Sequence, residues 1–227
     1  RQPDRGGAEE RLVHHQGVVL GDELVADLDA VGVEDARAAD ARVQGGRGRA
    51  VTFRGAEGTF EIEAERVVVA DGVRSPLGKV LGREWHRDTV YAVAGRSYVD
   101  STMSNDPWIS SHLELRGEEG QILSGYGWVF PLGDGSVNLG AGTLATAKRP
   151  ADIAIKPLMQ VYADTIRHDF GLSGELRMGA SALLPMGGAV SGVAGRNWAL
   201  IGDAAGCVNP LNGEGIDYGL ETGRLVA

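Results

Sequence analysis

Asp203 is the acidic residue whose position in the sequence best suits ligand binding. It follows Gly202 and the apolar run 198–201, which predicts a short buried strand. Ligands of open α/β sheets bind at the carboxyl ends of the strands, so a carboxylate there can accept hydrogen bonds from a sugar-like hydroxyl. The structural alternative is a simple strand-to-helix turn, with Asp203 as the N-cap of the helix.

The segment after Asp203 is rich in glycine and leads into a helix that is expected to start near residues 213–216. Gly206, Gly213 and Gly215 allow backbone N–H groups to approach a flat or anionic group closely. The positive end of the following helix points at the same group. Such a site stabilises a ring that carries negative charge, and the length of the pattern favours cofactor binding over a simple turn.

A second candidate motif consists of Asp71, Gly72 and Ser75 after the β-branched run 66–70. A strand, a sharp turn and a helix start at residues 76–81 together suit the binding of an anion. Asp-Gly is also a common turn dipeptide, so this motif alone is compatible with a turn that binds nothing. Its combination with the Asp203 segment favours a cofactor site.

Tyr126, Trp128 and Phe130 alternate along a predicted strand that ends at Pro131. Their rings are therefore expected on one side of a sheet, where they would form a wall for a long apolar ligand. Periodicity alone favours the alternative, which is ordinary core packing. Cys207 also has two interpretations: it contacts a ligand, or it is a small buried residue, as cysteine often is.

Two stretches resemble FAD-binding motifs of the flavoprotein hydroxylase superfamily, namely its G-D…P…G-x-G-I pattern and its D-G motif. The resemblance implies that Asp203 holds the ribityl chain of FAD, that the later glycines contact the flavin ring, and that the D-G motif lies near the pyrophosphate. The cofactor-binding residues that it implies are Asp71, Gly72, Ser75, Gly202, Asp203, Pro210, Gly213, Gly215 and Ile216.

The motif Y-x-W-x-F-P-x-G at residues 126–133 is similar to the substrate-wall motif of the geranylgeranyl reductase family. The similarity extends from about residue 66 to the end, and residues 125–142 and 180–225 especially resemble the bacterial branch with menaquinone side-chain reductases. It implies an FAD-dependent enzyme that saturates isolated double bonds of polyprenyl lipids, with electrons from NAD(P)H or another low-potential donor. Tyr126 is a candidate proton donor. The implied substrate contacts are Tyr126, Trp128, Phe130, Pro131 and Cys207.

Other activities remain open at this point. Flavin monooxygenases and halogenases share both flavin motifs, so hydroxylation with NAD(P)H and O₂ is the alternative reaction. Halogenases carry W-x-W-x-I-P where this chain has Tyr126 and Phe130, which disfavours halogenation. A non-catalytic fragment that binds lipid or a partner is the third alternative. The family begins with a G-x-G-x-x-G loop, which is missing here, because residues 45–48 lack its spacing. We therefore expect this chain to be a piece of a longer protein.

Composition limits the range of partners. The chain has 227 residues, 43% of them hydrophobic, and a net charge of −9, which argues against a nucleic-acid partner because phosphate binding needs a basic face. The single cysteine permits no internal disulfide and fits a reducing compartment. The histidines show no metal-ligand spacing, so no metal site is expected. We expect a cytoplasmic protein, with peripheral contact at the inner face of the membrane as an alternative.

The expected fold is α/β, with an incomplete FAD/NAD(P)-binding (Rossmann-like) domain at residues 1–88 and 175–227. An inserted, mainly antiparallel substrate-binding sheet with a helix is expected at residues 89–174. Turn signals separate its strand-like runs. The further predicted elements are a poorly ordered start at 1–17, a helix at 22–41, a hairpin of 50–54 with 59–63, strands at 90–99, 108–115, 121–130 and 136–142, and a helix at 157–170.

Overall fold

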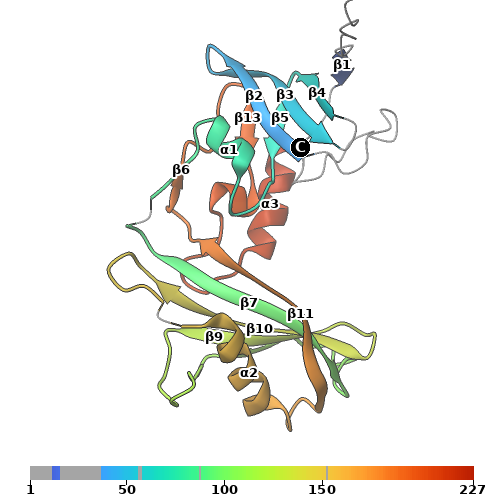
Figure 1. Cartoon of the computed structure of the whole chain (residues 1–227), viewed down its shortest axis with the longest axis vertical. Coiled ribbons are helices and arrows are strands. Elements are labelled where there is room, and N and C mark those ends of the chain that lie inside the picture. The colour runs from blue at the N-terminus through green and yellow to red at the C-terminus, as the bar shows by residue number, and fades with distance from the viewer. Residues whose placement is uncertain (1–11, 16–36, 56–57, 87, 152) are drawn as a thin grey trace, which may run out of the picture. The chain divides into compact units, whose positions relative to one another are not determined.

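The computed structural model describes residues 12–15, 37–55, 58–86, 88–151 and 153–227. It divides the chain into two compact units, of which the first is Arg1–His86 with Val190–Ala227 and the second is Arg87–Ala189 (Figure 1). The second unit ends at Ala189, whereas the sequence predicted that the inserted domain ends at residue 174. The reason is that strand β11 (Leu172–Pro185) pairs with β7 (Tyr91–Ser101), so it is part of the inserted sheet.

The first unit contains a parallel pair of strands, β5 (Val67–Val69) and β13 (Trp198–Leu200). The three valines of β5 are buried, as is typical of parallel strands with both faces covered. Since the two strands are parallel, they end at the same edge. The Asp71 turn follows β5 and the Asp203 turn follows β13, so the fold brings both predicted motifs to this edge, as in a Rossmann-like sheet.

A four-stranded sheet in the same unit has the order β1-β4-β3-β2 (Figure 1). Its strands β3 and β4 pair antiparallel and confirm the hairpin predicted from residues 50–54 and 59–63. The helix predicted at 22–41 is wrong for residues 37–41, because they form β2, whose pairing with β3 outweighs the helix propensity of alanine and arginine. The rest of that prediction, and most of residues 1–17, lie outside the described residues. The strands are β1 (Leu12–His15), β2 (Arg37–Gln44), β3 (Arg47–Gly55) and β4 (Gly58–Ala64).

Short elements complete the first unit. Strand β6 (Glu84–Trp85) pairs with β12 (Val190–Ser191). The helices are α1 (Pro76–Val80), a 3₁₀ turn at Gly202–Ala205 and α3 (Ile216–Val226). Among the helices of the described residues, none is both long and apolar enough to cross a bilayer.

The second unit is a five-stranded antiparallel sheet, in the order β11-β7-β10-β9-β8, with helix α2 (Ile155–Ile166) (Figure 1). Its core lies between α2 and the sheet, where Leu158 and Tyr162 of the helix pack with Val129 and Leu139. The predicted antiparallel sheet is therefore confirmed, although β11 was not expected. The remaining strands are β8 (Ser110–His112), β9 (Gly125–Pro131) and β10 (Ser136–Ala145).

Candidate functional site

The carboxylate of Asp203 is available to a ligand. It lies in the 3₁₀ turn directly after β13 and Ile201, at the carboxyl end of the strand. The side chain is partly buried and forms no hydrogen bond with any described residue, and its burial raises the pKa of the carboxyl group. A half-buried acceptor without a donor is an unfavourable state that a hydroxyl group of a ligand would relieve.

Glycines shape the loop around this carboxylate. Gly202, Gly206 and Gly213 have φ angles of 54°, 67° and 71°, in the left-handed region that glycine adopts without strain. A Cβ atom on Gly215 would lie 3.2 Å from Val208 Cγ2 and 3.5 Å from Asp203 Oδ1. The loop therefore closes tightly beside the carboxylate, and a side chain at residue 215 would crowd it.

The end of the loop presents free backbone donors. Gly215 precedes the first turn of α3, and no hydrogen bond from its N–H or from that of Ile216 is found among the described residues. Such unpaired N–H groups give a helix start its positive character. The Ile216 side chain is 66% exposed, so it is open to a flat apolar partner. These donors, the carboxylate and the close backbone together fit the flavin and sugar-like part of FAD.

Hydrogen bonds hold this loop in place. Asn209 N–H donates to Glu214 O at 2.8 Å, and Gly213 N–H donates to Asn209 O at 2.9 Å. The Asn209 amide also donates to Tyr218 Oη at 2.9 Å, which fastens the loop to α3. Pro210 lies in this closed segment and is exposed. The predicted cofactor residues from Gly202 to Ile216 thus belong to one well-braced loop.

The Asp71 turn is more enclosed. Asp71 is 8% exposed, and its Oδ2 accepts a hydrogen bond of 2.9 Å from Leu77 N–H, a backbone donor in the first turn of α1. Ser75 is fully buried, has φ of 36° and leaves its hydroxyl without a hydrogen-bond partner among the described residues. Gly72 O accepts from Ser75 N–H at 3.1 Å. Asp71 and Ser75 therefore build the turn, and Gly72 is its more accessible member.

Arg83 joins the two motifs, a role that the sequence did not reveal. Its Nε donates to Ala204 O at 2.6 Å and its Nη2 donates to Val73 O at 3.1 Å. The side chain is buried, and burial lowers the pKa of the guanidinium, while the charge of Asp71 opposes that effect. No motif marks this arginine, because its partners are backbone carbonyls far away in sequence.

Cys207 lies on the same loop, with its N–H donating to Gly202 O at 3.1 Å. Burial raises the pKa of the thiol, and the nearby charge of Asp203 adds to the effect. A raised pKa disfavours the thiolate, which is the nucleophilic form. The raised pKa of Cys207 is typical of a small packing residue or an apolar contact with a ligand, and it argues against a nucleophilic role.

In the second unit, Tyr126, Trp128 and Phe130 lie on one face of β9, as their alternation predicts. The ring centroid of Trp128 lies 6.0 Å from the ring centroid of Tyr126 and 6.3 Å from that of Phe130. All three are partly exposed, whereas Gly127 and Val129 between them are buried towards α2. The rings thus form an accessible row on the face that α2 does not cover, with Pro131 as the last residue of the strand.

Two neighbours on β10 position Trp128. Its indole N–H donates to Asn138 Oδ1 at 3.3 Å. A Cβ atom on Gly140 would lie 2.1 Å from Trp128 Cζ2, so the indole rests directly on this glycine. Register places Gly140 opposite Trp128 and Asn138 opposite Phe130. Neither residue was predicted from the sequence, although glycine within a strand is a signal of close approach.

Comparison with known proteins gives a consistent set of relatives. The chain is 70% identical to a menaquinone reductase of Mycolicibacterium smegmatis, over 71% of this chain and 40% of that protein. It is 30% identical to a digeranylgeranylglycerophospholipid reductase of Methanopyrus kandleri, over 96% of this chain and 53% of the relative. The chain thus spans about half the length of the curated relatives it matches. No protein-family model matches the sequence.

Solved structures share the fold. A geranylgeranyl bacteriochlorophyll reductase-like protein of Thermoplasma acidophilum aligns with a TM-score of 0.65 and 21% identity, over 83% of this chain and 46% of the other. A myxobacterial FAD-dependent halogenase aligns with a TM-score of 0.60 and 20% identity, over 86% of this chain and 45% of the other. At these identities the likeness establishes the fold, which reductases and halogenases have in common.

Proposed function

Because this chain belongs to the geranylgeranyl reductase family of FAD-dependent oxidoreductases, we propose that its protein saturates isolated double bonds in polyprenyl lipids. The substrate class is a menaquinone-type or geranylgeranyl chain. The name of the relative with 70% identity favours the menaquinone side chain. The reductant is NAD(P)H or another low-potential donor, and the place of action is the cytoplasm or the inner face of the membrane.

The observation that carries this proposal is the accessible aromatic row. A polyprenyl chain is long and apolar, and it offers little for hydrogen bonding. Three adjacent rings on one sheet face, with Trp128 fixed by Asn138 and Gly140, provide apolar area at low entropic cost. A hydroxylase that acts on a polar substrate has less use for such a surface.

Each part of the site has a task in this proposal. Bound FAD, once reduced, supplies a hydride. Asp203 would accept a hydrogen bond from the ribityl chain, and the N–H groups of Gly215 and Ile216 would help to hold the flavin ring. An isolated alkene is a poor hydride acceptor, so a proton must also be delivered, and we assign that role to Tyr126. The other proposed substrate contacts are Cys207 of the first unit and Pro131 of the second.

The experiment is a turnover assay with the full-length protein. Purified protein, FAD and dithionite are incubated without oxygen, with menaquinone or with a geranylgeranylated lipid, and products are analysed by mass spectrometry. We expect products that keep added hydrogen pairs after the quinone ring has been reoxidised in air, which places these hydrogens in the prenyl chain, and a strong loss of product for Trp128→Ala. A protein that stays colourless with FAD contradicts the proposal. Oxygen consumption with an oxygenated product in an aerobic assay with NADPH would instead establish a hydroxylase.

A further inference from the structure

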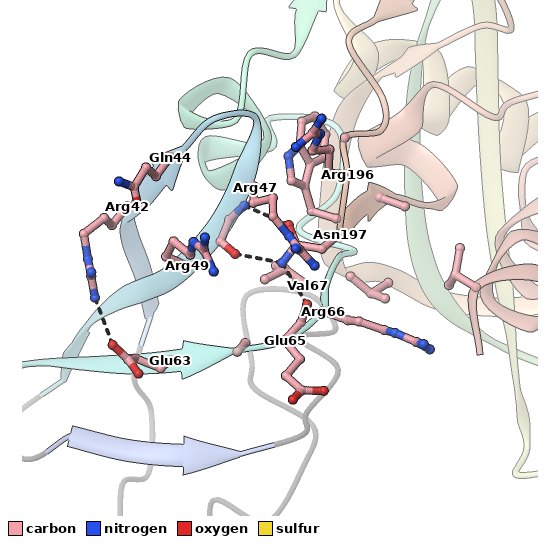
Figure 2. A pocket seen from close by; sticks show the side chains of 17 residues that line it. Arg42, Gln44, Arg47, Arg49, Glu63, Glu65, Arg66, Val67, Arg196 and Asn197 are labelled. Atoms are coloured by element: carbon pink, nitrogen blue, oxygen red, sulfur yellow. Dashed lines mark hydrogen bonds and ion pairs between the residues drawn. The ribbon is translucent and has the colours of Figure 1, made fainter.

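A basic pocket lies away from the site described above. It is an open pocket with a volume of about 1250 Å³, and all the residues that line it belong to the first unit (Figure 2). Arg66 precedes β5 and Asn197 precedes β13, so the pocket lies at the amino ends of these parallel strands. Asp71 and Asp203 follow the carboxyl ends of the same strands. The pocket is therefore distinct from the candidate FAD site.

Positive charge gathers in this pocket, although the chain as a whole carries a net charge of −9. Arg42 is neutralised, because it forms ion pairs of 3.0 Å with Glu61 and 3.2 Å with Glu63. Glu65 is the other acidic residue of the lining. Four more arginines line the pocket and have no ion pair with any residue that the structure describes; they are Arg47, Arg49, Arg66 and Arg196.

Asn197 holds the backbone of the pocket together (Figure 2). Its Oδ1 accepts from Gly48 N–H at 2.8 Å, and its Nδ2 donates to Gly48 O at 2.7 Å and to Glu65 O at 2.8 Å. The neighbouring Arg196 N–H donates to Gly46 O at 3.3 Å. These bonds tie the β2–β3 hairpin to the start of β13, so arginines from separate segments are kept around one space.

The hairpin itself directs two of the arginines. Gly45 and Gly46 have φ angles of 58° and 73°, which give the tight two-residue turn before Arg47. Register passes from the pair Arg42–Ala50 to the pair Val43–Gly48, so Arg49 is the extra residue of a β-bulge. Arg47 and Arg49 are two residues apart on β3 and both are exposed, whereas Gly48 between them is buried, so the two arginines lie on the same face of the strand and line the same pocket.

We propose that this pocket binds a phosphate-bearing anion through Arg47, Arg49, Arg66 and Arg196. A guanidinium group offers paired N–H donors that match two phosphate oxygens, and several guanidinium groups without an ion pair around one space add to the attraction for an anion. A diphosphate suits the number of arginines better than a single carboxylate does. The phosphate belongs either to a free small molecule or to a lipid headgroup. The site is independent of the proposed reductase activity.

Calorimetric titration of the full-length protein with inorganic diphosphate tests the proposal. The double variant Arg47→Gln/Arg49→Gln is expected to bind at least about tenfold more weakly, given the strength of charge-assisted hydrogen bonds. Arg54→Gln is the matched control, because Arg54 lies exposed on the same strand and outside the pocket. Binding should weaken with added salt.

A second arm uses sedimentation with vesicles of phosphatidylglycerol or of phosphatidylcholine. Diphosphate binding that the double variant loses identifies a free phosphate ligand. If the wild type sediments with phosphatidylglycerol vesicles but not with phosphatidylcholine vesicles, and the double variant sediments with neither, the ligand is a lipid headgroup. Far-UV circular dichroism and urea unfolding establish that both variants are folded. Absence of binding in both arms, or equal binding by the double variant and the wild type, overturns the proposal.

Discussion

Arg83 Nε donates a hydrogen bond of 2.6 Å to the carbonyl oxygen of Ala204. The same guanidinium donates to Val73 O at 3.1 Å, so one side chain connects the turn after β5 with the turn after β13. Its position 5.6 Å from the ring centroid of Trp85 adds a cation–π contact. The two stretches that resemble FAD-binding motifs are therefore held in one arrangement by an arginine that belongs to neither.

Replacement of this arginine is the first test. Arg83→Met should destabilise the first unit by about 1–3 kcal/mol, because it removes a buried donor from two carbonyl oxygens. Urea unfolding measures the change, and FAD affinity should fall with it. Arg74→Met is the control, since Arg74 lies exposed in the same turn, and it should unfold as the wild type does. Equal stability of the two variants would show that the Arg83 bonds contribute little.

Asp203 gives a prediction about pH. Burial raises its pKa in the folded protein, so the unfolded chain ionises first as pH rises. The cofactor-free protein therefore loses stability as pH rises from the ordinary carboxyl pKa, near 3.8, to the higher pKa of Asp203 in the folded protein. Asp203→Asn should unfold at higher urea than the wild type at pH 7, and the difference should vanish below about pH 4. The same variant should bind FAD more weakly. A variant with reduced stability at pH 7 would contradict this account.

Local chemistry explains which features the sequence could predict. The run of valines in β5, the alternation of Tyr126, Trp128 and Phe130, and the glycines around Asp203 are signals within a few residues. They predict a buried strand, a one-sided row of rings and a tight loop, and the structure contains each of them.

Contacts between distant segments explain what the sequence could not predict. β2 contains residues that favour helix, and its strand conformation comes from pairing with β3. β11 is an edge strand with a broken register, so it lacks the apolar pattern of a central strand. Arg83 and Asn197 act through carbonyl oxygens and N–H groups, which every residue possesses. No motif could therefore point to their partners.

Gly140 tests whether the indole of Trp128 forms part of the substrate surface. Gly140→Ala would place a methyl group 2.1 Å from the present position of Trp128 Cζ2 and 2.6 Å from the backbone oxygen of Gly95. The ring and the neighbouring strand β7 must therefore both shift, and the bond of Trp128 to Asn138 is lost. We expect a changed emission spectrum and a raised KM for the long polyprenyl substrate. Gly179→Ala is the matched control, because a Cβ atom there meets no atom within 4 Å in the same sheet. A similar KM in both variants would argue against a substrate contact at Trp128.

His112 gives the final prediction, on the stability of the second unit. Its Nδ1 lies 2.5 Å from Tyr162 Oη, and burial lowers the pKa of the imidazole, which the charge of Asp169 opposes. The unfolded chain therefore takes up the proton first, and stability that is present above about pH 6.5 is lost as pH falls towards the folded pKa. His112→Gln lacks this titration, so its urea midpoint should fall less than that of the wild type between pH 7.5 and pH 5. His168→Gln, at an exposed position of the same unit, should follow the wild type. If the His112 variant shows the full wild-type decline, the acid sensitivity arises elsewhere in the unit.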